Sequence, residues 1–224
     1  MRILGWLCMA LCFGTGAVNA TPKVTQWQQL FDEPRLRMIE ARFGQQGVEQ
    51  VMALKAFIET SLAEPVAAPQ QLQRVNDFFN QYQFISDQQH WQRADYWATP
   101  LEFVASGGGD CEDFSLAKFF TLRVLGMPSS QLRLMYAKAV ELNQAHMVLT
   151  YQPPSSAMPL VLDNINPKIL PGAQRPDLVP VYSFNGEGLW RARAFNKGEQ
   201  IRQGDNGIEL WQELLERLQL KESS

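Results

Sequence analysis

The spacing of apolar residues separates a helical first half of the chain from a strand-rich second half. Over residues 25–83 apolar side chains recur at intervals of three and four, which is the period of an amphipathic helix. Pro65 and Pro69 interrupt this pattern after residue 62, and a second apolar face continues to Tyr82. We therefore predict mostly helix over 25–83, with a break at the two prolines.

Two shorter helices are predicted around a glycine-rich segment. The sequence Thr99-Pro100-Leu101-Glu102 combines an N-cap threonine, a proline at the first helical position and a glutamate three residues after the cap. This helix should end at the three glycines 107–109. The next helix should run from Asp110 to Leu125, where Gly126 and Pro128 end it. Residues 86–98 are rich in aromatic and polar side chains and are predicted to form a loop.

The second half of the chain shows short apolar or alternating runs that are typical of strands. Asn185-Gly186 between two of these runs predicts a hairpin. An amphipathic helix should close the chain between Ile208 and Leu218. Helices followed by an antiparallel sheet and a last helix indicate the α+β class. The predicted strands are 131–140, 146–152, 159–165, 179–184 and 188–195.

Composition limits the classes of function. The chain has 224 residues, of which 46% are hydrophobic and 19% charged, so it is long and apolar enough for a folded core. The formal net charge is −3, and lysine and arginine do not cluster. Nucleic-acid binding is therefore not indicated.

The first 20 residues have the pattern of a secretory signal peptide. Arg2 precedes an apolar run over 3–13, and Val18-Asn19-Ala20 places small residues at positions −3 and −1 of a cleavage site. We predict cleavage after Ala20 and a single domain over 21–224, with an uncleaved anchor as the alternative. No other segment is long and apolar enough to span a bilayer.

Signal cleavage would leave one thiol. Of the three cysteines, Cys8 and Cys12 lie in the signal, and Cys111 would remain in an oxidising compartment without a partner for an internal disulfide. Cys111 lies at a predicted helix start, where unpaired N–H groups and the helix dipole favour a thiolate. The glycines before it would let the backbone turn sharply and approach a substrate. The alternative is a small buried apolar residue.

Three carboxylates surround this thiol. At 100° per residue Asp110, Glu112 and Asp113 lie on one side of the helix and Cys111 on the other, so the acids need not touch the sulfur. These acids could simply complement the helix dipole. Alternatively they could bind Ca²⁺, which prefers carboxylate oxygens and would offset their charge. Spacing alone does not require a metal, since the pattern is not that of an EF-hand.

A thiol nucleophile needs a base, and the chain contains two histidines. His146 begins a predicted strand, and Asp163 lies near the end of the following one, so an antiparallel pairing could bring them together. Imidazole would take the thiol proton while the carboxylate fixes its tautomer and orientation. His90, in the polar loop, is the competing base. Taken singly, His146 could be a surface histidine and Asp163 a turn residue.

With these residues assembled, the sequence resembles the bacterial transglutaminase-like cysteine proteinases. The resemblance rests on Gly-x-Gly-Asp-Cys-Glu-Asp over 107–113, within the longer blocks 95–126 and 160–171. It implies a papain/transglutaminase-like fold in which a helical lobe carries the nucleophile Cys111. A sheet would carry the base His146 and the orienting carboxylate Asp163.

The resemblance also implies a cofactor and a biological role. Calcium would bind Asp110, Glu112 and Asp113, and an indole N–H from Trp97, or alternatively Trp91, would help to form the oxyanion hole. Adhesin-processing members of this family act in the periplasm. They cut the N-terminal region of a large surface adhesin at paired alanines, which disperses the biofilm, and an inner-membrane receptor for cyclic-di-GMP sequesters them. The competing functions are a transglutaminase-type acyltransferase with the same triad and a non-catalytic calcium-dependent binding module.

Overall fold

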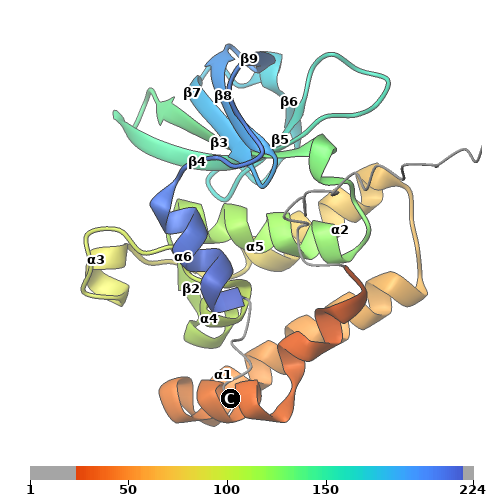
Figure 1. The fold of residues 1–224 in the computed structure, drawn as a ribbon, viewed down its shortest axis with the longest axis vertical. Helices are drawn as coiled ribbons and strands as arrows, with labels where there is room; N and C mark the ends of the chain where they lie inside the picture. Colours follow the sequence, from red (N-terminus) through yellow and green to blue (C-terminus); the bar gives the residue numbers. More distant parts are fainter. Residues whose placement is uncertain (1–23, 219–224) are drawn as a thin grey trace, which may run out of the picture.

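The first half of the chain forms a helical layer. A computed structural model describes residues 24–218, and helices before the sheet make up most of residues 24–124 (Figure 1). The predicted break at the prolines is observed, since one long helix ends at Ala63 and the next begins at Ala68. The helical elements are η1 (Val24–Phe31), α1 (Glu33–Ala63), α2 (Ala68–Asn80), α3 (Asp87–His90), α4 (Pro100–Ser106), α5 (Cys111–Val124) and α6 (Glu209–Leu218).

Local signals explain where the helices of this layer begin and bend. α4 begins with a complete capping box, in which Thr99 and Glu102 each accept from the other's backbone N–H, and it ends at Gly107 in the left-handed conformation. α1 is interrupted at Gly44, whose φ of 70° is costly for other residues and marks a kink. The predicted loop over 86–98 also contains the single turn α3.

The second half of the chain forms one seven-stranded antiparallel sheet in the order β6-β5-β4-β3-β7-β8-β9. β3 lies at its centre, between β4 and β7. The hairpin predicted at Asn185-Gly186 is observed, and it joins β7 to β8. β6 and β9 were not predicted, because β6 has two residues and β9, with the sequence NKGEQIRQ, lacks an apolar pattern. The strands are β3 (Leu132–Ala139), β4 (Gln144–Tyr151), β5 (Leu160–Leu162), β6 (Leu170–Pro171), β7 (Leu178–Asn185), β8 (Gly188–Arg193) and β9 (Asn196–Gln203). Short 3₁₀ turns, η2 (Ser129–Gln131) and η3 (Gly172–Gln174), precede β3 and β7.

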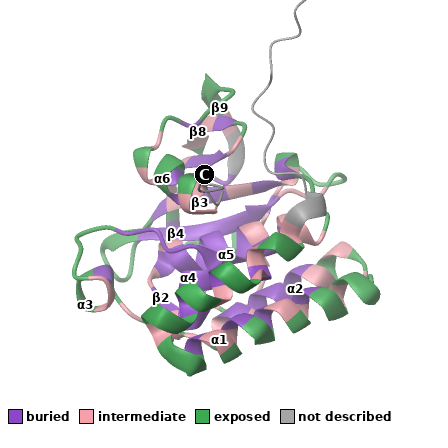
Figure 2. Cartoon of the chain, turned by 60° about the horizontal axis from the view of Figure 1, so that its bottom comes forward, coloured by how far each residue is buried: buried purple, intermediate pink, exposed green. Residues whose placement is uncertain are grey.

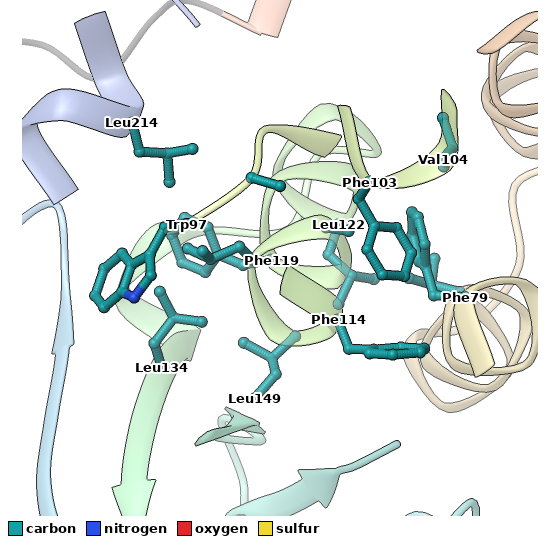
Figure 3. Packing of buried hydrophobic residues seen from close by; sticks show 14 of the residues in the cluster. Phe79, Trp97, Phe103, Val104, Phe114, Phe119, Leu122, Leu134, Leu149 and Leu214 are labelled. Atoms are coloured by element: carbon teal, nitrogen blue, oxygen red, sulfur yellow. The ribbon is translucent and has the colours of Figure 1, made fainter. Parts of the chain in front are cut away.

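The main core lies between the helices and one face of the sheet. α5 and β4 are buried where they meet, whereas α1 and α2 expose their outer faces to solvent (Figure 2). Phe114 and Leu122 of α5 pack in this core with Leu149 of β4 (Figure 3). Since α5 is covered on most sides, its first turn is held firmly against the sheet, and the α+β prediction is confirmed.

The glycine-rich segment is held by close backbone contacts within the protein. Gly108 and Gly109 form the short strand β2 (Gly108–Gly109), which pairs in parallel with β1 (Gln83–Phe84) at the end of α2. A Cβ atom at Gly108 would collide with the Gln83 carbonyl oxygen, and one at Gly109 would collide with the Asp113 carboxylate. These two glycines thus allow the chain to pack against itself, which differs from the predicted approach to a substrate.

None of the helices described between residues 24 and 218 is long and apolar enough to cross a membrane. The predicted signal peptide and its cleavage site lie outside the described residues, so both stay predictions.

Candidate active site

The thiol of Cys111 lies between the start of α5 and the start of β4. Cys111 is the first residue of α5, and Asp110 is the N-cap. The backbone N–H of Met147 donates to the Cys111 sulfur at 3.4 Å, while the Ser115 hydroxyl, one turn along α5, donates to the Met147 carbonyl at 3.0 Å. These two contacts fix the thiol beside the strand that carries His146.

His146 and Asp163 form a buried pair. Nε2 of His146 lies 2.8 Å from Oδ1 of Asp163, and both side chains are almost inaccessible to solvent. The second oxygen, Oδ2, accepts from Nη2 of Arg175 at 2.6 Å. Although burial opposes ionisation, the hydrogen bond and charge of His146, with the Ile165 N–H and Arg175, lower the pKa of Asp163 to about 2. An ionised carboxylate can only accept hydrogen bonds, so the Nε2 atom that faces Asp163 carries the ring proton. Nδ1 is then the ring nitrogen that can take up or release a proton.

Glu112 touches the thiol, which the helical spacing did not predict. The sulfur of Cys111 donates to Oε2 of Glu112 at 2.7 Å, and no hydrogen bond among the described residues joins it to His146. A glutamate has enough reach to fold back over the adjacent residue in the first turn, so its nominal helix face does not decide its contacts. Burial and then the charge of Glu112 raise the pKa of the Cys111 thiol well above its usual range.

A second carboxylate cluster lies beneath the start of α5. One oxygen each from Asp87, Asp110 and Asp113 lie within 4.8 Å of one another. Asp113 is fully buried and accepts from the Ala98 N–H at 2.7 Å and from the Asp110 N–H at 3.3 Å, which completes a capping box. A neighbouring group of donor atoms joins Asp110 to Cys111 and Glu112. Asp110 thus belongs to both groups.

The chain itself leaves the charge of this cluster unbalanced. Burial, followed by the charges of Glu112 and Asp113, raises the pKa of Asp110 to about 10. Burial likewise raises the pKa of Asp87 to about 6 and the pKa of Asp113 well above its usual range. Oδ1 of Asp87 is buried and has no hydrogen-bond partner. An orphaned carboxylate oxygen beside two further carboxylates fits a hard cation such as Ca²⁺.

Asp87 is the site residue that sequence reasoning missed. It lies 23 positions before Asp110, in the predicted loop, and only the fold brings the two together. The available signal was Ser86-Asp87 before a short turn, which is common in loops. Distant acids of this kind have no diagnostic spacing.

The other sequence candidates have different surroundings. Trp97 is buried, stacks on Phe184 at 5.6 Å and lies between Leu214 of α6 and Leu134 of β3 (Figure 3). Its indole Nε1 has no hydrogen-bond partner of normal geometry among the described residues. It does interact with the Asp95 carboxylate, which opposes the rise in the pKa of Asp95 caused by burial and by the charge of Glu112. Trp91 packs against Tyr96 and His90, and no contact between the described residues links His90 to Cys111. This geometry brings His146, rather than His90, next to the thiol-bearing turn.

Comparisons with known proteins identify the family of the chain. A family model described as bacterial transglutaminase-like cysteine proteinase matches residues 48–177. The structure is similar to calcium-bound Legionella pneumophila LapG, with 40% sequence identity and a TM-score of 0.67, over 83% of this chain and 98% of that chain. EGTA-treated LapG matches at 40% identity with a TM-score of 0.70, over 83% and 96% of the two chains. A search of curated proteins found no match. The chain belongs to the bacterial transglutaminase-like cysteine proteinases.

Proposed function

We propose that this protein is a calcium-dependent cysteine endopeptidase of the periplasm, with Cys111 as nucleophile, His146 as general base and acid, and Asp163 as orienting carboxylate. The observation that carries the proposal is the position of the thiol. The first turn of α5 holds Cys111 against the backbone of Met147, the residue after His146, whose ring is fixed by Asp163. Nucleophile, base and orienting group are thus contributed by adjoining elements.

The reaction follows from these positions. Nδ1 of His146 takes the proton of Cys111 as the sulfur attacks the carbonyl carbon of a peptide bond. The same nitrogen then gives its proton to the departing amine, which leaves a thioester on Cys111. Water attacks this thioester with His146 again acting as base, and the free carboxylic acid and the thiol are restored. Trp97 stays a predicted oxyanion-hole donor, because an indole N–H can donate to a developing oxyanion.

Calcium would be held by Asp110, Glu112 and Asp113, with Asp87 as an added ligand. Bound calcium would supply positive charge beside the thiol. Glu112 accepts from the sulfur, and both burial and this carboxylate favour the protonated thiol. Drawing Glu112 into a metal site would remove the chain's own obstacle to a reactive thiolate. The structures of a relative in calcium-bound and EGTA-treated forms support testing this metal first.

The proposed substrate is the N-terminal region of a large surface adhesin, cut at paired alanines, so that the adhesin is released and the biofilm disperses. The proposed regulator is the periplasmic domain of an inner-membrane receptor that binds cyclic-di-GMP and sequesters the enzyme. Family membership and the likeness to LapG support both ideas. The signal-peptide pattern of residues 1–20 supports a periplasmic location independently.

A cleavage assay tests the function directly. The protein from Thr21 onward is mixed with the recombinant N-terminal region of the host's largest repeat-rich adhesin. Wild type and Cys111→Ala are each run with Ca²⁺, with Mg²⁺ and with a strong chelator, and the products are sequenced from their N-termini. We expect one new N-terminus from wild type with Ca²⁺ alone.

The controls separate this proposal from its rivals. A fluorescent primary amine is included in a parallel reaction. Incorporation of the amine without a new N-terminus would instead establish a transglutaminase, since the two activities share a thioester and differ in its acceptor. Full activity of Cys111→Ala would contradict any thiol mechanism, and full activity with chelator would contradict the metal requirement.

A further inference from the structure

We propose that Arg175 is a positioning residue of the active site, which holds the Asp163 carboxylate so that its free edge meets His146. This inference rests on the proposed function and goes beyond the Cys111, His146 and Asp163 triad. Nη2 of Arg175 donates to Oδ2 of Asp163 at 2.6 Å, while Oδ1 faces His146 at 2.8 Å. Each carboxylate oxygen thus has a different partner.

This division fixes the orientation of the carboxylate. A carboxylate can rotate about the bond to its Cβ, and this torsion has a broad, shallow preference. Oδ1 is also held by the Ile165 N–H at 3.0 Å. With Arg175 on Oδ2, rotation would break strong contacts at both oxygens, so the edge presented to His146 cannot turn away.

Arg175 is itself anchored from the opposite side. Its Nε donates to Oδ1 of Asp177 at 2.9 Å, and its Nη2 also reaches Oδ2 of Asp177 at 2.6 Å. Asp177 is 34% exposed, whereas the Arg175 side chain is 1% exposed. The guanidinium therefore bridges Asp177, which is partly exposed, and Asp163, which is buried. An arginine that served only to pair with Asp177 would not need this buried position.

Burial makes the contact consequential. The side chains of Asp163 and Arg175 are 0% and 1% exposed. Removal of one partner from a buried pair leaves the other charge uncompensated. Lys118 of α5 also exerts its charge on Asp163, but burial lowers the pKa of Lys118 to about 7. Among the described residues, Arg175 is the cation that hydrogen-bonds this carboxylate.

Proton NMR of the histidine rings gives a readout that does not depend on activity. The chain has two histidines, so the ring signals are few and can be assigned with a His90→Gln variant. The Nε2 proton of His146, shared with a buried carboxylate, should give a strongly deshielded signal. We expect this signal to move upfield or broaden in Arg175→Met. Arg175→Lys, which retains the charge, should restore part of the shift.

Kinetics with the adhesin fragment provide the second readout. Misorientation of the base should lower kcat by about 10- to 100-fold in Arg175→Met and leave KM nearly unchanged. Arg193→Met is the matched control, because it removes the same charge from an exposed side chain that is 76% accessible. That control should keep the wild-type His146 signal and the wild-type kcat.

The outcomes decide the proposal. A folded Arg175→Met with an unchanged His146 signal and unchanged kcat would overturn it. If Arg175→Met does not fold, Asp177→Asn decides, because Asp177 is partly exposed and orients the guanidinium: an upfield shift supports the proposal, and an unchanged signal overturns it. If wild type cleaves nothing while the NMR shift occurs, the proposed substrate has failed and the positioning role stands.

Discussion

The proposed site contains the single carboxylate of Asp163 and a cluster of three carboxylates at the start of α5, and the protein surrounds the two with opposite charges. Asp163 accepts from His146 and Arg175, and its pKa falls to about 2. Asp110 lies with Asp87 and Asp113 among like charges, and its pKa rises to about 10. The first group is neutralised by the chain, whereas the second is not.

This difference supports the acids at the start of α5, rather than Asp163, as the proposed cation site. Glu102, a third buried carboxylate, follows the pattern of Asp163, because it accepts from Arg42 at 2.6 Å and from Arg217 at 2.7 Å. The chain thus supplies arginines where a carboxylate has a fixed role in the structure. The acids at the start of α5 accept from backbone N–H groups, but no cationic side chain between residues 24 and 218 donates a hydrogen bond to them. Burying several carboxylates without a compensating positive charge is energetically costly, unless a metal binds them or they keep their protons.

The largest effect should follow from breaking the neutralised group. Asp163→Asn keeps the size of the side chain but removes the charge that fixes the His146 tautomer, so kcat should fall by about 10³- to 10⁴-fold. Steady-state cleavage assays measure this loss, and circular dichroism checks the fold. Asp205→Asn, at an exposed carboxylate, is the control and should retain wild-type activity. A drop of less than tenfold would show that Asp163 is not the orienting carboxylate.

Calcium should have the next largest effect, because it acts on the unbalanced group. At a calcium concentration of 100 Kd, binding should stabilise the fold by about 2.7 kcal/mol, which raises Tm by roughly 5–10 °C for a domain of this size. Asp110→Asn retains a good N-cap but removes one charge. This variant should lose most of the calcium-induced shift.

The same variant should behave differently without metal. In chelator, Asp110→Asn should be at least as stable as wild type, because it removes a carboxyl that burial and like charges penalise. Asp205→Asn should show the full calcium shift. An undiminished shift in Asp110→Asn would place calcium elsewhere in the protein.

Local signals made most of the fold predictable. The Thr99–Glu102 capping box, the prolines 65 and 69, and the alternating runs gave the helices and central strands at nearly their observed positions. Strand β9 was not predicted, because its pairing depends on the neighbouring strand β8 rather than on its own polar sequence. The kink at Gly44 was not predicted either, because a single glycine within a helical pattern does not reveal its dihedral angles.

The site was less predictable than the fold. The order of Cys111, His146 and Asp163 suggested which strands would have to adjoin, and the last two lie in contact. Asp87 and Arg175 carry no local pattern, because their partners are brought to them by the folding of distant segments. Glu112 shows a further limit: helical angles place a Cβ atom, but a long side chain can reach a neighbour on another face.

The pH dependence of stability should have opposite signs for the two groups. In metal-free protein, the raised pKa values of about 6 for Asp87 and about 10 for Asp110 mean that the folded state holds protons which the unfolded chain has released. The free energy of unfolding should therefore fall steadily as pH rises from roughly 5 to 8. Saturating calcium should flatten this slope.

Asp163 gives the contrasting limb of the same experiment. Its lowered pKa contributes stability that is present above its unfolded value and is lost as pH falls toward about 2. Urea unfolding at a series of pH values, with calcium and with chelator, measures both limbs. If metal-free protein gained stability between pH 5 and 8, the acids around Asp110 could not be the unbalanced group.

The smallest effect should come from removing one of the two arginines that contact Glu102. This change tests whether a single arginine is enough to stabilise the buried carboxylate. Arg42 is 50% exposed and Arg217 is 29% exposed, so Arg42→Met leaves the more buried partner in place. Solvent screens the lost interaction, and the free energy of unfolding should fall by only about 0.5 kcal/mol. Urea titration with an unchanged m-value would measure this difference. A loss above about 2 kcal/mol would mean that Glu102 depends on both arginines. A buried carboxylate in this protein would then need two cations rather than one. For Asp163 these two cations would be Arg175 and Lys118.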